Sequence, residues 1–93
     1  MKIGFIGLGN MATAMIGGII NKGIVTKDEI YGADAFEVAV NKAKENLGIH
    51  AGGDNLEVVE KADILVLAVK PQFYQAVISQ IKGHIKESQI VVS

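Results

Sequence analysis

Ile3-Gly4-Phe5-Ile6-Gly7-Leu8-Gly9-Asn10-Met11-Ala12 is the stretch of sequence that decides the fold. Its first four residues form an apolar run typical of a buried strand, and a helical pattern begins where it ends. Between the two, Gly7, Gly9 and Ala12 make a G-x-G-x-x-A pattern. In this position the pattern is typical of a turn that binds the pyrophosphate of a dinucleotide. The glycines allow a tight turn and close backbone approach, and the small third residue allows close helix packing.

Downstream of this stretch, short β-rich runs alternate with segments of helical period. We predict strands at residues 3–6, 29–33, 49–51, 64–69 and 90–92, and helices at residues 10–22, 36–47, 55–61 and 72–82. Strands that alternate with helices indicate βαβ units and a parallel sheet. Right-handed crossovers then favour an α/β, doubly wound, Rossmann-like sheet with strand order 3-2-1-4-5, in one domain over residues 1–93.

The helical periods also predict which side chains face the core. The expected core positions are Ala12, Ile16, Ile19 and Ile20 in the first helix, Phe36, Val40, Ala43 and Leu47 in the second, and Phe73, Val77 and Ile81 in the last. We also expect Met15 in the core. Gly17 and Gly18 are expected to pack closely on the sheet, because a glycine inside a helix otherwise costs about 1 kcal/mol.

The composition argues against several classes of function. Hydrophobic residues make up 49% of the 93 residues, and nine basic and ten acidic residues are interspersed, for a net charge of −1. No surface for nucleic acid or anionic lipid is therefore expected, and the apolar N-terminus is too short to span a membrane. There is no cysteine, and His50 and His84 lack metal-ligand spacing, so no metal site is predicted. The lack of cysteine is compatible with the cytoplasm, which we predict.

Asp34 lies at the end of the second predicted strand, about 20 residues after the Gly-rich turn. An acidic residue at this spacing accepts hydrogen bonds from the hydroxyls of the adenosine ribose. It also repels a 2′-phosphate, so the spacing favours NADH. No arginine follows, and Lys42 lies a full turn or more into the next helix. The alternative interpretation is a helix-capping aspartate that faces solvent.

The segment Ala68-Val69-Lys70-Pro71-Gln72 follows the most apolar of the predicted strands. Ligands of parallel sheets bind outside the carboxyl ends of the strands, so this loop is expected to face the cofactor. Pro71 makes a rigid exit, because proline keeps the preceding residue out of the helical region. The loop would support the nicotinamide or its ribose, with Lys70 near a phosphate or hydroxyl. Alternatively, Lys70 is a surface lysine before a helix-starting proline.

Two blocks of sequence, residues 1–12 and the Ala-Asp-Ile-Leu-Val-Leu-Ala-Val-Lys-Pro-Gln of residues 62–72, resemble pyrroline-5-carboxylate reductases. Val-Lys-Pro-Gln is the discriminating string. The first block is also similar to 3-hydroxyisobutyrate dehydrogenases, which usually have glycine where this chain has Ala12. The resemblance covers essentially all 93 residues and only the N-terminal, dinucleotide-binding domain of the family. It implies reduction of 1-pyrroline-5-carboxylate to L-proline, with hydride from NADPH or NADH.

The resemblance also implies a set of cofactor contacts. They are Ile6, Gly7, Leu8, Gly9, Asn10, Met11, Asp34, Asn55, Ala68, Val69, Lys70 and Pro71. The role of Asn55 rests on the resemblance, since this residue otherwise reads as part of a helix cap. Many family members carry serine, asparagine or arginine near the position of Asp34 and use NADPH. Asp34 departs from them, so both cofactors stay open.

The chain ends immediately after a predicted strand. From this we expect it to be a fragment of a longer protein. The resemblance implies a helical C-terminal domain that holds the substrate and forms a homo-oligomer. We therefore assign no catalytic residue and expect these 93 residues alone to have little or no reductase activity. Two other functions stay open. One is another reductase of the 6-phosphogluconate-dehydrogenase-like group, such as a hydroxyacid dehydrogenase, and the other is a dinucleotide-binding module without catalysis.

Overall fold

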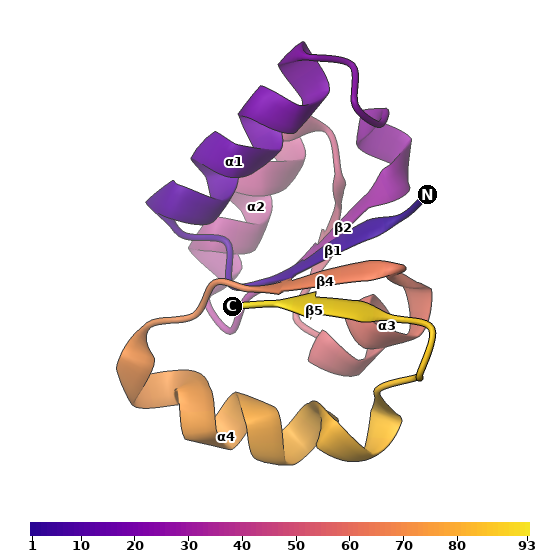
Figure 1. Ribbon diagram of the computed structural model, residues 1–93. Helices are drawn as coiled ribbons and strands as arrows, with labels where there is room; N and C mark the ends of the chain where they lie inside the picture. Colours follow the sequence, from indigo (N-terminus) through magenta and orange to yellow (C-terminus); the bar gives the residue numbers. More distant parts are fainter.

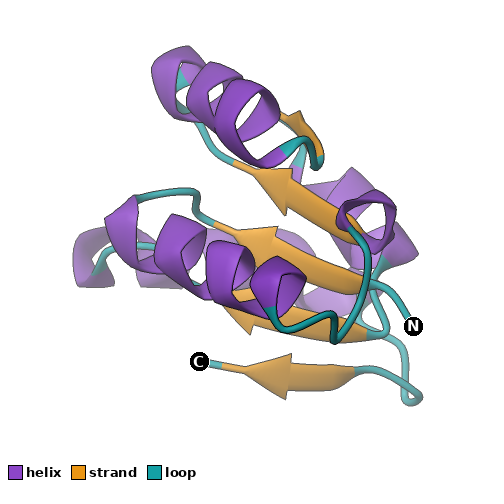
Figure 2. Ribbon diagram, turned by 90° about the horizontal axis from the view of Figure 1, so that it is seen from above, coloured by secondary structure: helices purple, strands orange, loops and turns teal.

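Five parallel strands form one sheet in the computed structural model, which describes residues 1–93 (Figure 1). The strands are β1 (Ile3–Ile6), β2 (Ile30–Ala33), β3 (His50–Gly52), β4 (Ile64–Leu67) and β5 (Ile90–Val92). Their order is β3-β2-β1-β4-β5, which confirms the predicted order and the doubly wound class. Figure 2 shows the strands side by side, with β5 at one edge. β1 lies at the centre and is buried along its whole length.

Four helices cover the two faces of this sheet. They are α1 (Asn10–Asn21), α2 (Glu37–Leu47), α3 (Asn55–Lys61) and α4 (Pro71–Ile81), with short 3₁₀ turns at Lys27–Glu29 and Lys82–His84. α1 and α2 lie on one face, and α3 and α4 on the other (Figure 1). The apolar core is therefore divided into two layers, one around Ile16 and Ala43 and the other around Val59 and Ile81. None of the helices combines the length and apolar character needed to cross a membrane.

Every predicted element is present, but several ends shift by one or two residues. β2 begins at Ile30 because Glu29 belongs to the preceding turn, where its carboxylate accepts the N–H of Thr26 at 3.0 Å. β4 ends at Leu67, two residues earlier than predicted, and Ala68 and Val69 belong to the loop that leads to α4. α4 begins one residue earlier than predicted, at Pro71, as suits a proline in the first turn of a helix.

Three side chains that were expected in the core are exposed. Phe36 is 66% exposed because it precedes α2 with an extended backbone and so leaves the helical stripe. Phe73 is 46% exposed because it lies in the first turn of α4, where it lines the cleft described below. Met15 is 42% exposed because it lies off the α1 face that buries Ala12 and Ile16.

The two glycines within α1 do not pack on the sheet, so that expectation is wrong. A Cβ atom at Gly17 would lie 4.0 Å from the side chain of Leu47 in α2, and one at Gly18 would meet nothing within 4 Å. Gly17 therefore faces the neighbouring helix, and Gly18 faces solvent.

Candidate cofactor-binding site

The carboxyl ends of three neighbouring strands meet at one edge of the sheet. Ile6 of β1 pairs with Ala33 of β2 on one side and with Leu67 of β4 on the other, so the three strands end level. From this edge the chain leaves β1 toward one face of the sheet, into α1, and leaves β4 toward the opposite face, into α4 (Figure 1). Open α/β sheets bind ligands in the crevice beyond such a switch point.

Gly7 begins the turn that follows β1, and the backbones on both sides hold it in place. Its N–H donates to the carbonyl oxygen of Ala33 at 2.8 Å, and the N–H of Ala68 donates to the carbonyl oxygen of Ile6 at 2.8 Å. Gly7 has φ = 100°, and a Cβ there would stand 2.7 Å from the carbonyl carbon and oxygen of Ala68. Only glycine satisfies both the backbone angle and the close approach.

Gly9 occupies the open side of the same turn, directly before α1. A Cβ at this position would meet nothing within 4 Å, so the backbone borders free space. α1 has no side-chain cap and no acidic residue in its first turn. The N–H groups at the start of the helix are therefore not occupied by a side chain of this protein, and they carry the partial positive charge of a helix N-terminus. Phosphate groups fit such a position.

Asp34 ties the Gly-rich turn to the end of β2. One carboxylate oxygen accepts the N–H of Leu8 at 2.8 Å, and the other accepts the N–H of Phe36 at 2.9 Å. The structure therefore differs from the solvent-facing cap that was one of the two interpretations of this residue. A carboxylate offers about four acceptor positions, so two stay available for a ligand beside these two bonds.

A cleft of about 690 Å³ opens where the three loops meet. Eight of the residues predicted to bind the cofactor line this cleft: Ile6, Gly7, Gly9, Asp34, Asn55, Ala68, Val69 and Lys70. The other four do not line this cleft. Leu8 is buried, with its side chain against Gly32, and Met11 is 69% exposed. Asn10 lines the neighbouring groove, and Pro71 begins α4.

The exit from β4 has the conformation that its proline predicts. Lys70 precedes α4 with φ = −64° and ψ = 150°, an extended backbone, and its carbonyl oxygen accepts the N–H of Phe73 at 2.9 Å. The loop thus lines the cleft beside the Gly-rich turn, and Lys70 contributes a positive charge to it.

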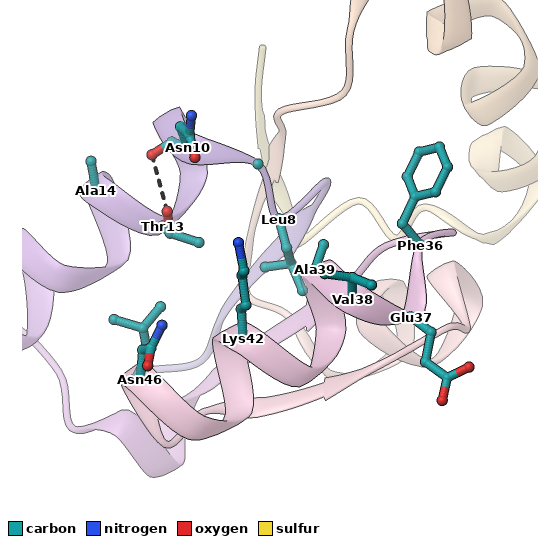
Figure 3. A pocket seen from close by; sticks show the side chains of 12 residues that line it. Leu8, Asn10, Thr13, Ala14, Phe36, Glu37, Val38, Ala39, Lys42 and Asn46 are labelled. Atoms are coloured by element: carbon teal, nitrogen blue, oxygen red, sulfur yellow. Dashed lines mark hydrogen bonds between the residues drawn. The ribbon is translucent and has the colours of Figure 1, made fainter.

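A second hollow, a groove of about 810 Å³, lies between α1 and α2 (Figure 3). Asn10 and Thr13 line it from α1, where the Thr13 hydroxyl donates to the carbonyl oxygen of Asn10 at 3.1 Å. Lys42 and Asn46 line it from α2. In Figure 3 the Lys42 side chain extends into the groove toward α1, whereas Glu37 points away.

Comparison with known proteins identifies the family. Residues 2–93 match the family described as NADP oxidoreductase, coenzyme F420-dependent. The chain belongs to this NADP oxidoreductase family.

Among individual relatives, pyrroline-5-carboxylate reductase from Methanosarcina acetivorans is 42% identical over 92 residues, which cover 99% of this chain and 34% of the relative. Solved structures of the same class superpose closely. The enzyme from Coxiella burnetii has a TM-score of 0.86 at 34% identity, covering 92% of this chain and 32% of that one. The pyrroline carboxylate reductase from Plasmodium falciparum, solved with NADP bound, has a TM-score of 0.81 at 30% identity, covering 98% and 32%. The chain thus spans about a third of the length of the relatives it matches.

Some residues that line the cleft were not predicted from the sequence to belong to the site. Gln80 of α4 accepts a hydrogen bond from the side-chain amide of Asn55 at 3.0 Å, and both residues line the cleft. Phe36, which precedes α2, and Phe73 of α4 also line it. No spacing rule relates Asn55 to Gln80, and the two aromatic residues were assigned to the core. The signal available in the sequence was the position of each phenylalanine at a helix start, next to a predicted binding loop.

The two histidines lie outside both hollows of the site. His50 of β3 stacks on Tyr31 with ring centroids 4.7 Å apart, and its Nε2 lies 3.0 Å from the carbonyl oxygen of Asp28. Nowhere do three or more histidine, aspartate or glutamate side chains gather where they could hold a metal ion. The polar groups that line the two hollows of the site include Asp34, Asn55, Lys70 and Lys42.

Proposed function

We propose that this chain is the NAD(P)H-binding part of a pyrroline-5-carboxylate reductase, which reduces 1-pyrroline-5-carboxylate to L-proline. The observation that carries the proposal is the turn from Gly7 to Gly9. It is tied to β2 and β4, and it borders the cleft at Gly9, where the backbone has free space. The likeness to pyrroline-5-carboxylate reductases supports the reaction.

The residues around the cleft fit a nicotinamide dinucleotide. The N–H groups at the start of α1 would hold the pyrophosphate beside Gly9. Asp34 would face the adenosine ribose, as an acid at the end of the second strand does in this fold. The loop from Ala68 to Pro71 would support the nicotinamide half. When bound, the reduced nicotinamide supplies a hydride, and the residues of this chain bind and orient it.

Asn55 would act as an acceptor at the floor of the cleft. Its amide nitrogen already donates to Gln80 at 3.0 Å, so its oxygen is left for a ligand hydroxyl. Ribose hydroxyls are the donors that a dinucleotide offers. This supports the role that the resemblance implied for Asn55.

The substrate and the partners belong to the proposal for the full-length reductase. The chain covers about a third of its relatives, so we propose that substrate contacts and a homo-oligomer interface come from the remaining two thirds. We propose the cytoplasm as its location. No residue of these 93 is assigned a catalytic role.

Cofactor binding is tested by isothermal titration of the chain with NADH and NADPH. We expect Gly9→Val to weaken binding about tenfold or more, because the added side chain takes the space that the pyrophosphate needs. Gly18→Val is the matched control, since a Cβ there also meets nothing within 4 Å. It should leave affinity unchanged. Equal affinities for the wild type and Gly9→Val would show that the turn does not bind the cofactor.

The substrate is tested on the full-length protein. Oxidation of NADPH or NADH is followed with 1-pyrroline-5-carboxylate and, in parallel, with the keto acids that hydroxyacid dehydrogenases reduce. Turnover of the cyclic imine is expected. Turnover of the keto acids alone, or tight cofactor binding with no turnover of either, would reject the proposed reaction.

A further inference from the structure

The groove between α1 and α2 adjoins the cofactor cleft. Gly9, Phe36 and Ala39 line both hollows, so the two meet beside the Gly-rich turn and the end of β2. The end of β2 is where Asp34 would face the adenosine ribose. A substituent on the 2′-oxygen of that ribose therefore has the groove within its reach.

The groove contains one unpaired cation. Lys42 lines it, and the only salt bridge of the molecule joins the Met1 ammonium group to Glu29, so Lys42 has no carboxylate partner. Side chains on a helix lean toward its N-terminus, and that direction takes the Lys42 ammonium group toward the Gly-rich turn. Figure 3 shows this direction and shows Glu37, the acidic residue of the lining, turned away.

Neutral polar groups complete the lining. Asn10 and Asn46 carry amide N–H donors on opposite walls, from α1 and α2. The hydroxyl of Thr13 donates to the carbonyl oxygen of Asn10, which leaves its lone pairs rather than its proton toward the groove. A cation that has no ion-pair partner and lies among amide donors, open to solvent, can receive a phosphate monoester.

Asp34 and Glu37 are the acidic residues near this end of the groove. Glu37 points away from it in Figure 3, and the geometry of Asp34 limits the effect of its charge. Its two carboxylate oxygens are engaged by the N–H groups of Leu8 and Phe36, at 2.8 and 2.9 Å. Hydrogen bonds from backbone amides spread the negative charge, and they hold the carboxylate against the turn.

We propose that the groove between α1 and α2 receives the 2′-phosphate of NADPH, and that Lys42 is the residue that sets the preference for NADPH over NADH. This inference rests on the proposed function. It replaces the preference for NADH that the position of Asp34 alone favours. The specificity residue would then lie in the second turn of α2 rather than directly after β2.

The test compares Lys42→Met with Lys44→Met by titration with NADPH and NADH. Methionine keeps much of the apolar stem and removes the charge. Lys44 lies on the same helix but lines a different hollow, beside β3, so its variant is a matched control. Lys42→Met should weaken the binding of NADPH about tenfold or more, because a hydrogen bond to a charged group is lost. It should leave the affinity for NADH unchanged. Lys44→Met should change neither affinity.

A second pair of ligands tests the contribution of the 2′-phosphate alone. Adenosine 2′,5′-bisphosphate should bind the wild type more tightly than 5′-ADP, and Lys42→Met should remove the difference. The inference is overturned if the wild type prefers NADH, or if Lys42→Met weakens both dinucleotides equally. If the wild type binds neither dinucleotide, the proposed function fails as well, and that result is distinct from a loss of preference alone.

Discussion

At the scale of single residues, Gly7 shows how one position can be fixed by two independent constraints. Its φ of 100° is costly for any residue with a Cβ, and the backbone of Ala68 stands where that Cβ would be. The first constraint belongs to the turn itself, and the second to the loop that follows β4. Gly23, with φ = 69° and no atom within 4 Å, carries only the first.

We therefore expect Gly7→Ala to cost more stability than Gly23→Ala. The strained backbone alone should cost about 1–2 kcal/mol at Gly23. The added contact with Ala68 should bring the loss at Gly7 to about 3 kcal/mol or more. Urea unfolding followed by circular dichroism measures both variants. Equal losses would mean that the turn moves away from Ala68 without cost.

The residue scale is also where the sequence was most and least informative. Gly7, Gly9 and Ala12 were predictable, because their spacing between a strand and a helix has few other uses. Phe36 and Phe73 were misassigned because helical period says nothing about a residue at the start of a helix, where the backbone or the neighbouring surface changes. The bond between Asn55 and Gln80 was beyond reach, since it joins two helices through side chains alone.

At the scale of elements, every strand and helix was predictable and several of their ends were not. The apolar periods and the glycine and proline positions mark each element clearly. The ends depend on local hydrogen bonds that compete with the element. The start of β2 is an example, because Thr26 and Glu29 bond to each other and form a 3₁₀ turn in place of the first residue of the strand.

That turn predicts a dependence of stability on pH. The pKa of Glu29 lies below its ordinary range, chiefly because its carboxylate accepts the N–H of Thr26 and also because it accepts a hydrogen bond from the Met1 ammonium group. A lowered pKa in the folded state means that this stabilisation is present above the ordinary glutamate pKa of about 4.3 and is lost as the pH falls below it.

The wild type should therefore lose more thermal stability between about pH 5 and pH 3 than Glu29→Gln does, since glutamine does not titrate. Melting temperatures measured across this range provide the comparison. Glu45→Gln, on the exposed surface of α2 and without an ion-pair partner, is the control and should follow the wild type. Parallel curves for the wild type and Glu29→Gln would contradict the role of the turn.

At the scale of the whole molecule, the sheet separates two apolar layers that share little besides its strands. Ile16 of α1 is fully buried in one layer, and Ile81 of α4 is 1% exposed in the other. Side chains on opposite faces of a sheet do not touch. Small losses of packing in the two layers should therefore act independently.

Ile16→Val and Ile81→Val should each cost about 1 kcal/mol. The double variant should lose the sum of the two to within about 0.5 kcal/mol. Urea unfolding of the wild type, the two single variants and the double variant completes this double-mutant cycle. A loss in the double variant that departs clearly from the sum would show that the layers are coupled through the strands between them.

The central position of β1 also determines when the site comes into existence as the chain folds. Ile3 pairs with Ile30 on one side and with Ile64 on the other, so the second pairing closes a loop of some sixty residues. Such long-range closure is slow compared with the formation of a helix. Two hydrogen bonds hold the Gly-rich turn, one from Gly7 to Ala33 and one from Ala68 to Ile6. Both can form only when β2 and β4 lie beside β1. Binding competence therefore belongs to the last stage of folding, and a ligand of this turn would hold the first and last thirds of the chain together.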